Sequence, residues 1–139
     1  MNWKEKCFAA LSAENMFEDS WHKTRFKELL DCYTDSPFFS KGLCKCMYLS
    51  AWDDEHFCLM LETLTDMSLG QDTNTDDMRI NGDILAKEQD TDGYYLFQLS
   101  NAFLDNVPFK IDVSAKVSPE TWHIIQRAIQ AGEIIDALD

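Results

Sequence analysis

The sequence predicts an all-α fold, a single compact bundle of about six helices that spans residues 1–139 as one helical domain. Three observations favour this class. Apolar residues recur at three- and four-residue intervals along most of the chain, which is the period of a helix. Glycine (5) and proline (3) are too scarce for a turn-rich sandwich or barrel. The 139 residues, 45% of them hydrophobic, suffice for one core but not for two.

Two helices are expected before residue 36. The apolar spacing predicts the first at residues 2–11 and the second from about Asp19 to Tyr33, with Asp19 or Ser20 as its cap. His22 lies on the apolar stripe of the second helix. We therefore expect it to be a core or boundary histidine whose nitrogens bond to the protein, not a catalytic group.

The third and fourth helices have recognisable start signals. Ser36-Pro37 predicts the start of a helix that runs to about Ala51, because a capping hydroxyl followed by proline is typical of a helix N-terminus. Asp53-Asp54-Glu55 supplies a cap and two first-turn acids for a fourth helix that ends near Met67.

The remaining chain divides into an acidic loop region, two helices and a segment of alternating pattern. Within the acidic loop region, residues 68–92, residues 68–77 are polar and loop-like, Met78, Ile80, Ile84 and Leu85 permit a short helix, and residues 90–93 are expected to form a turn. A fifth helix is expected over residues 93–105. Residues 109–117 alternate with a period of two, which fits one short extended segment or an isolated strand. Ser118-Pro119 starts the last helix, and Gly132 is expected to stop it.

The apolar stripes of these helices predict the core. The side chains expected to be mostly buried are Phe26, Leu29, Met47, Leu64, Leu99, Phe103, Trp122 and Ile125.

The charge is large and unevenly distributed. The formal net charge is −13. Residues 1–50 hold 7 basic and 7 acidic residues, whereas residues 53–92 hold 12 acidic residues and only Arg79 and Lys87. Direct binding to nucleic acid is excluded as a function, because it requires a basic surface. One side of the fold should instead be markedly negative.

This acidic surface is the candidate partner-binding site. We expect a basic protein partner, such as a nuclease or effector that binds nucleic acid, because complementary fields speed association. Small size, high negative charge and abundant aspartate are similar to phage-encoded inhibitors of host defence, among them anti-CRISPR proteins. The candidate binding residues are Asp53, Asp54, Glu55, Glu62, Asp66, Asp72, Asp76, Asp77, Asp83, Glu88, Asp90 and Asp92.

A hydrophobic skeleton runs through residues 17–131. Its members are Phe17, His22, Phe26, Leu29-Leu30, Tyr48-Leu49, Leu96, Leu99, Asn101-Ala102-Phe103-Leu104, Trp122, Ile125 and Ala128-Ile129. This pattern resembles a group of small uncharacterised helical proteins from Firmicutes and their phages and mobile elements. The resemblance implies a bacterial or phage origin and an all-helical fold, and it carries over no functional residues.

Two patterns suggest metal sites, and neither has suitable ligands. Asp72-x-Asn74-x-Asp76 with Asp83 is similar to a calcium loop, but it lacks the glycine and the bidentate glutamate that such a loop needs. Cys44 and Cys46 would point about 200° apart on a helix and could not share a zinc ion. We therefore expect no cofactor and no bound metal.

No pattern of an enzyme active site is present. The sequence contains no nucleophile elbow, phosphate loop or His-Glu-x-x-His motif, so no catalytic residue is assigned. A different hypothesis is a small metal-dependent enzyme or sensor that uses His22, His56 and the acidic loop.

Charge and cysteine content indicate the compartment. No apolar run approaches the length of a membrane span, and the five irregularly spaced cysteines fit reduced thiols better than a disulfide framework. We expect a cytoplasmic protein that does not bind membranes.

Overall fold

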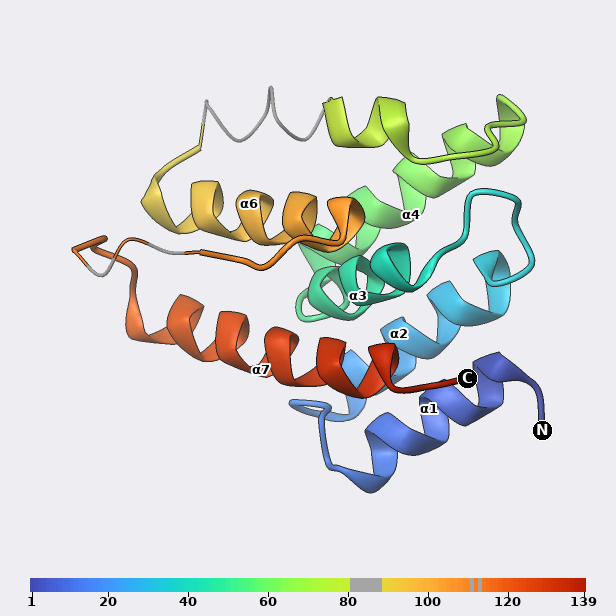
Figure 1. Ribbon diagram of the computed structural model, residues 1–139, viewed down its shortest axis with the longest axis horizontal. Coiled ribbons are helices and arrows are strands. Elements are labelled where there is room, and N and C mark those ends of the chain that lie inside the picture. Colours follow the sequence, from blue (N-terminus) through green and yellow to red (C-terminus); the bar gives the residue numbers. More distant parts are fainter. Residues whose placement is uncertain (81–88, 111, 113) are drawn as a thin grey trace.

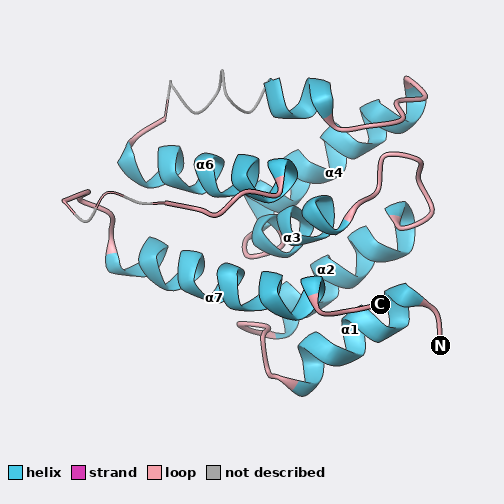
Figure 2. Cartoon of the chain, viewed as in Figure 1, coloured by secondary structure: helices cyan, strands magenta, loops and turns pink. Residues whose placement is uncertain are grey.

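The computed structural model describes residues 1–80, 89–110, 112 and 114–139, and this part of the chain is helical and contains no strand (Figures 1 and 2). The prediction of an all-α fold is confirmed. The helices are α1 (Trp3–Ala13), α2 (Ser20–Tyr33), α3 (Lys41–Ser50), α4 (Asp54–Leu69), α6 (Thr91–Asp105) and α7 (Pro119–Asp136). Residues 76–80 form a further helical turn at the edge of the described chain.

Helix α3 lies at the centre of the bundle. It packs against α2, α4, α6 and α7, and in Figure 1 it lies between α4 and α6 above and α2 and α7 below. Seven consecutive residues of α3, 43–49, are buried. A helix that is buried around its whole circumference acts as the core on which the others pack.

Gly42 allows α6 to pack closely against the start of α3. A Cβ atom at this position would overlap the backbone carbonyl oxygen of Phe103 and would lie 3.3 Å from the Cα of Leu104. Glycine is unfavourable inside a helix because its backbone is flexible. At position 42 it is needed because the backbones of α3 and α6 approach each other closely.

The third helix begins later than the sequence predicted. Ser36-Pro37 lies in a turn, and α3 starts at Lys41 with Ser40 as its cap, whose Oγ accepts a hydrogen bond from Leu43 N at 3.1 Å. The turn brings Phe38 into the core, where its ring lies 6.3 Å from that of Tyr33. Burial of this side chain overrides the local start signal.

Two other predicted boundaries were wrong. Helix α7 continues through Gly132 to Asp136, because Gly132 is buried and faces the side chains of Lys45 and Phe103. Residues 90–93, expected as a turn, contain the cap Asp90 and the first turn of α6.

The segment expected to be extended forms no strand in the residues that are described there. Ala115 N donates to Asp112 O at 2.9 Å, which makes a turn within the segment, and residues 111 and 113 lie outside the described chain. Phe109 and Val117 are partly buried and pack on the core. The two described ends of the alternating pattern therefore dock on the helices.

Two lysines of α3 neutralise the carboxyl end of α7. Lys41 Nζ donates to Asp136 O at 3.1 Å and to Leu138 O at 2.5 Å, and Lys45 Nζ lies 2.7 Å from Asp136 Oδ2. The last turn of α7 contains no basic residue of its own. Because the carboxyl end of a helix carries partial negative charge, these lysines stabilise α7 from another element.

His22 is fully buried in an aromatic cluster, as the sequence predicted for a core histidine. Its ring centroid lies 4.7 Å from that of Tyr48, 4.9 Å from that of Trp52 and 5.4 Å from that of Phe17. Nδ1 accepts from Glu18 N at 3.1 Å, and Nε2 donates to Tyr48 O at 3.0 Å. Only the neutral tautomer with its proton on Nε2 satisfies both bonds.

Most of the predicted core is confirmed. Phe26, Leu29, Met47, Leu64, Leu99 and Ile125 are buried. Phe103 and Trp122 are only partly buried. The buried stripe of α7 runs through Thr121, Ile125 and Gly132, so Trp122 lies at its edge.

Leu99→Ala should lower the free energy of unfolding by about 2–5 kcal/mol, because it leaves a cavity in a close-packed core. Trp122→Ala should cost on the order of 1 kcal/mol, since the indole already lies partly in water. Denaturant unfolding of the two variants measures the difference. Equal losses would contradict the peripheral position of Trp122.

Stability should depend on pH through His22. Burial lowers the pKa of His22 below its ordinary value of 6.5, although the hydrogen bond to Tyr48 O opposes this shift. Below about pH 6.5 the unfolded chain binds a proton that the folded chain does not, so the free energy of unfolding falls as the pH drops. His22→Gln should be less stable at neutral pH and lose less stability on acidification. A variant with the wild-type slope would assign the effect to another group.

Candidate acidic interaction surface

Helix α4 and the chain that follows it carry seven of the predicted acidic residues. Six are exposed and Asp72 is partly exposed. In Figure 1, α4 and residues 70–80 lie along the upper side of the molecule, away from α1. The seven are Asp54, Glu55, Glu62, Asp66, Asp72, Asp76 and Asp77.

None of these seven carboxylates makes an ion pair with a lysine or arginine of the described chain. Arg79, although close in sequence, pairs with Asp105 of α6 at 3.2 Å. The N-terminal helices differ in charge balance, because residues 1–50 hold equal numbers of basic and acidic residues, and Asp31 there lies 3.3 Å from Lys4 Nζ and 2.8 Å from Lys27 Nζ. The excess negative charge is therefore concentrated on the α4 side.

Glu62 and Asp66 stand where charge destabilises α4. They are four residues apart, so their carboxylates repel each other on the helix surface. Asp66 also lies in the last turn, where the helix dipole disfavours an acid and where α4 has no basic residue. The stability of the helix does not explain these two acids.

Three of the predicted binding residues have structural roles instead. Asp53 Oδ1 accepts from His56 N at 2.8 Å as the cap of α4, and Asp90 Oδ1 accepts from Gly93 N at 2.8 Å as the cap of α6. Asp92 Oδ1 accepts from Ser118 N at 2.9 Å, and this bond lowers the pKa of Asp92. Asp90 and Asp92 therefore contribute to the fold as well as to the charge. Asp83 and Glu88 lie outside the described residues.

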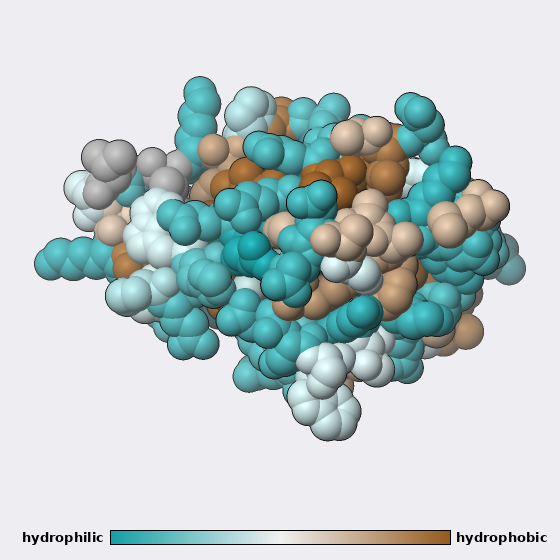
Figure 3. Space-filling model, turned by 90° about the horizontal axis from the view of Figure 1, so that it is seen from below, coloured by the Kyte–Doolittle hydropathy of each residue, from teal (hydrophilic) through white to brown (hydrophobic). Residues whose placement is uncertain are grey.

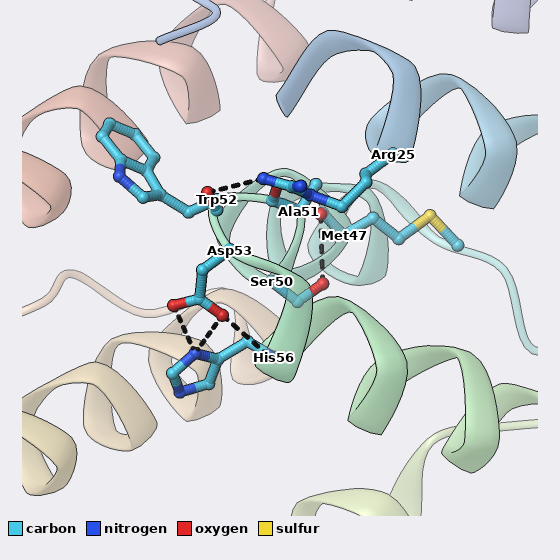
Figure 4. A network of polar contacts seen from close by, with 7 residues as sticks. All are labelled: Arg25, Met47, Ser50, Ala51, Trp52, Asp53 and His56. Carbon is cyan, nitrogen blue, oxygen red and sulfur yellow. Dashed lines mark hydrogen bonds and ion pairs between the residues drawn. The ribbon is translucent and has the colours of Figure 1, made fainter. Parts of the chain in front are cut away.

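The junction between α3 and α4 sets the direction in which α4 leaves the core (Figure 4). Arg25 of α2 donates from Nε to Ala51 O at 2.7 Å and from a terminal nitrogen to Trp52 O at 2.8 Å. The guanidinium thus binds two carbonyls at the end of α3. Immediately afterwards Asp53 caps α4 and also lies 2.8 Å from His56 Nδ1.

The segment similar to a calcium loop makes local hydrogen bonds in the structure. Asn74 Oδ1 accepts from Asp76 N at 3.0 Å, and residues 76–80 are helical, so the loop ends before Asp83. Among the residues that the structure describes, no three histidine, cysteine or acidic side chains are placed to hold a metal ion.

The neighbouring cysteines of α3 face different helices. Cys44 Sγ lies 3.8 Å from Cys7 Sγ of α1, whereas Cys46 Sγ donates to Ser100 O of α6 at 3.4 Å. Burial raises the pKa of Cys44 and brings that of Cys46 to about 12. Both are therefore protonated thiols at neutral pH, and their sulfur atoms face different helices.

Two of the three histidines, His22 and His123, pack against Trp52, and the three form no ligand site in the described part of the chain. His22 has both ring nitrogens bonded to the backbone, and the His123 ring lies 5.8 Å from Trp52 with its Nε2 3.1 Å from Glu18. His56 is exposed and paired with Asp53. The structure thus does not bring His22 and His56 together with the acidic loop.

Sequence reasoning missed a groove of about 400 Å³ between α6 and α7. Phe103, Phe109 and Ile129 line it, and the ion pair between buried Lys45 and exposed Asp136 lies beside them. The sequence did contain a signal for the groove, because Lys45 is a charged residue between two cysteines in a helix of buried residues. The groove is lined mainly by apolar side chains, with Asn106, Glu133 and the Lys45–Asp136 ion pair as its polar groups.

Exposed apolar side chains occur on the side of the molecule opposite to α4 (Figure 3). The face in Figure 3, viewed from the α1 side, is mostly hydrophilic and carries a band of hydrophobic residues. Trp21 of α2 is also largely exposed. What distinguishes the α4 side is its excess of acidic over basic residues.

No protein family model, curated protein or solved structure matches this chain. No described helix is long and apolar enough to cross a membrane.

Calcium or a chelator should leave the melting temperature unchanged, because Asn74 Oδ1 already accepts a hydrogen bond from Asp76 N and the described residues of the loop form no ligand shell. Differential scanning fluorimetry with millimolar calcium, and separately with EDTA, measures this. A rise of several degrees in the melting temperature with calcium would contradict this prediction and indicate a metal site at Asp72, Asn74, Asp76 and Asp83.

Proposed function

We propose that this chain is a non-catalytic acidic interaction module that occupies the basic nucleic-acid-binding surface of another protein. One observation carries the proposal: seven carboxylates lie on the α4 side without a lysine or arginine partner in the described chain. A basic groove would supply the missing countercharges.

The physical basis is electrostatic complementarity. Carboxylates fixed on a helical scaffold present negative charge to a positively charged channel, as phosphates do, and complementary fields accelerate the encounter. The same charge repels nucleic acid itself. The module therefore competes with nucleic acid for the partner and does not bind to it.

The resemblance to small helical proteins of Firmicutes and their mobile elements supports a choice of partner. Together with the acidic composition similar to anti-CRISPR proteins, it favours a nuclease or effector of bacterial host defence. In this proposal the chain is a phage or mobile-element inhibitor that acts in the cytoplasm.

Glu62→Gln with Asp66→Asn should slow association with the partner roughly tenfold, because it removes two unpaired charges from the encounter surface. The variant should be at least as stable as the wild type, since both charges oppose the helix. The partner is first captured from a bacterial lysate or from a panel of purified nucleases. Surface plasmon resonance then measures rates, and nucleic acid should displace the protein.

A matched control removes the same charge from the balanced half of the chain. Glu28→Gln with Asp35→Asn changes two exposed residues there and should leave association unchanged. Affinity should also weaken as salt rises, since exposed charges are screened over about 8 Å at physiological ionic strength. A tight partner that is indifferent to salt, to nucleic acid and to the α4 variant would refute the proposal.

A further inference from the structure

Helix α4 has one face that the described chain leaves uncovered and that carries large apolar side chains. Leu59 is 47% exposed and Leu69 is 79% exposed. At about 100° per residue, both fall with Glu55, Glu62 and Asp66 in one sector of roughly 80°. This sector, residues 55, 59, 62, 66 and 69, is called the outer face of α4 below.

The outer face is presented on a firmly held helix. On its other side α4 buries Phe57, Met60, Leu64 and Met67 in the core. At one flank, Tyr33 of α2 has its hydroxyl oxygen 2.8 Å from Thr65 Oγ1. The leucines therefore point away from the core because the helix is fixed, and rotation of α4 to bury them would expose its core residues.

The two leucines are separated along the helix by acidic residues. Their positions are ten residues apart, which corresponds to about 15 Å along the axis. Glu62 and Asp66 occupy the interval and make no ion pair with a lysine or arginine of the described chain. Apolar contact is thus available near both ends of the face and negative charge in the middle.

We infer that the outer face of α4 binds a basic amphipathic helix of a protein partner. In such a complex, apolar side chains of the partner cover Leu59 and Leu69, and lysine or arginine side chains meet Glu62 and Asp66. This inference rests on the proposed function, which requires only a basic surface. It adds that the partner offers two apolar contact points about 15 Å apart.

Charge selects this occupant over others. A second copy of the chain would set Glu55, Glu62 and Asp66 against acids of the same face, since a twofold contact pairs a patch with itself. Nucleic acid and an anionic membrane surface carry the same sign of charge and would be repelled. A basic protein helix satisfies both the leucines and the carboxylates.

The test uses two synthetic probes of equal positive charge. One is a helical peptide of lysine and leucine with its leucines on one face, and the other is an oligolysine. Fluorescence anisotropy measures binding of each labelled probe to the full chain at physiological salt. We expect the amphipathic peptide to bind at least tenfold more tightly than the oligolysine.

Variants separate the apolar from the electrostatic contribution. Leu59→Ser with Leu69→Ser should weaken the amphipathic peptide to the level of the oligolysine and leave oligolysine binding unchanged. Glu62→Gln with Asp66→Asn should weaken both probes. Trp21→Ser with Val107→Ser, which alters exposed apolar residues elsewhere, is the matched control and should change neither affinity. Circular dichroism checks that each variant is folded.

The outcomes distinguish this inference from the proposed function. Equal binding of both probes, or an affinity for the amphipathic peptide that the leucine variant leaves intact, would overturn the inference and leave an acidic surface that recognises charge alone. Binding of neither probe would overturn both. Concentration-dependent dimerisation in light scattering that the leucine variant abolishes would also overturn it, because the occupant would then be a second copy.

Discussion

The burial of α3 is the constraint on which the rest of the structure depends. Seven consecutive residues of this short helix are buried, so four other helices must cover it. Its circumference includes Lys45, whose charge cannot be buried without a partner, and Asp136 of α7 supplies that partner. The position of α7 is thereby tied to the chemistry of α3 as well as to its shape.

The same central helix determines how closely its neighbours approach. Gly42 admits the backbone of α6, and Gly132 leaves room for the stems of Lys45 and the ring of Phe103. Two residues that would weaken isolated helices therefore serve packing between helices. In such a close-packed core, a substitution that changes side-chain volume is destabilising, because the atoms that line a void lose dispersion contacts.

With α3 enclosed, α4 covers it with one face and leaves the other in water. The buried face and the cap at Asp53 hold the helix in place, and Arg25 bonds the carbonyls just before it. The acids on the free face neither cap the helix nor make ion pairs with lysine or arginine in the described chain, and Asp66 opposes the helix dipole. An exposed face whose charged residues oppose the stability of their own helix, in a protein whose core is packed as usual, is commonly a functional surface. Hence the proposals above rest on this face.

The sequence by itself determined the fold class, most helix positions, the charge asymmetry and the buried character of His22, because these follow from forces within one or two turns. The side chain of a cap such as Asp19 or Ser118 accepts a hydrogen bond from an amide three residues away, and an apolar stripe can be recognised from residue spacing alone. The acids of α4 could likewise be named in advance.

Only the tertiary structure decided which acids are available and where several elements begin and end. Asp92 accepts a hydrogen bond from Ser118 N, and Lys45 forms an ion pair with Asp136, 91 positions further along the chain. Helix α7 continues through Gly132 because the side chain of the distant Lys45 covers that residue. The start of α3 at Lys41 depends on the burial of Phe38. Each of these outcomes rests on contacts between residues remote in sequence, and local spacing does not encode those contacts.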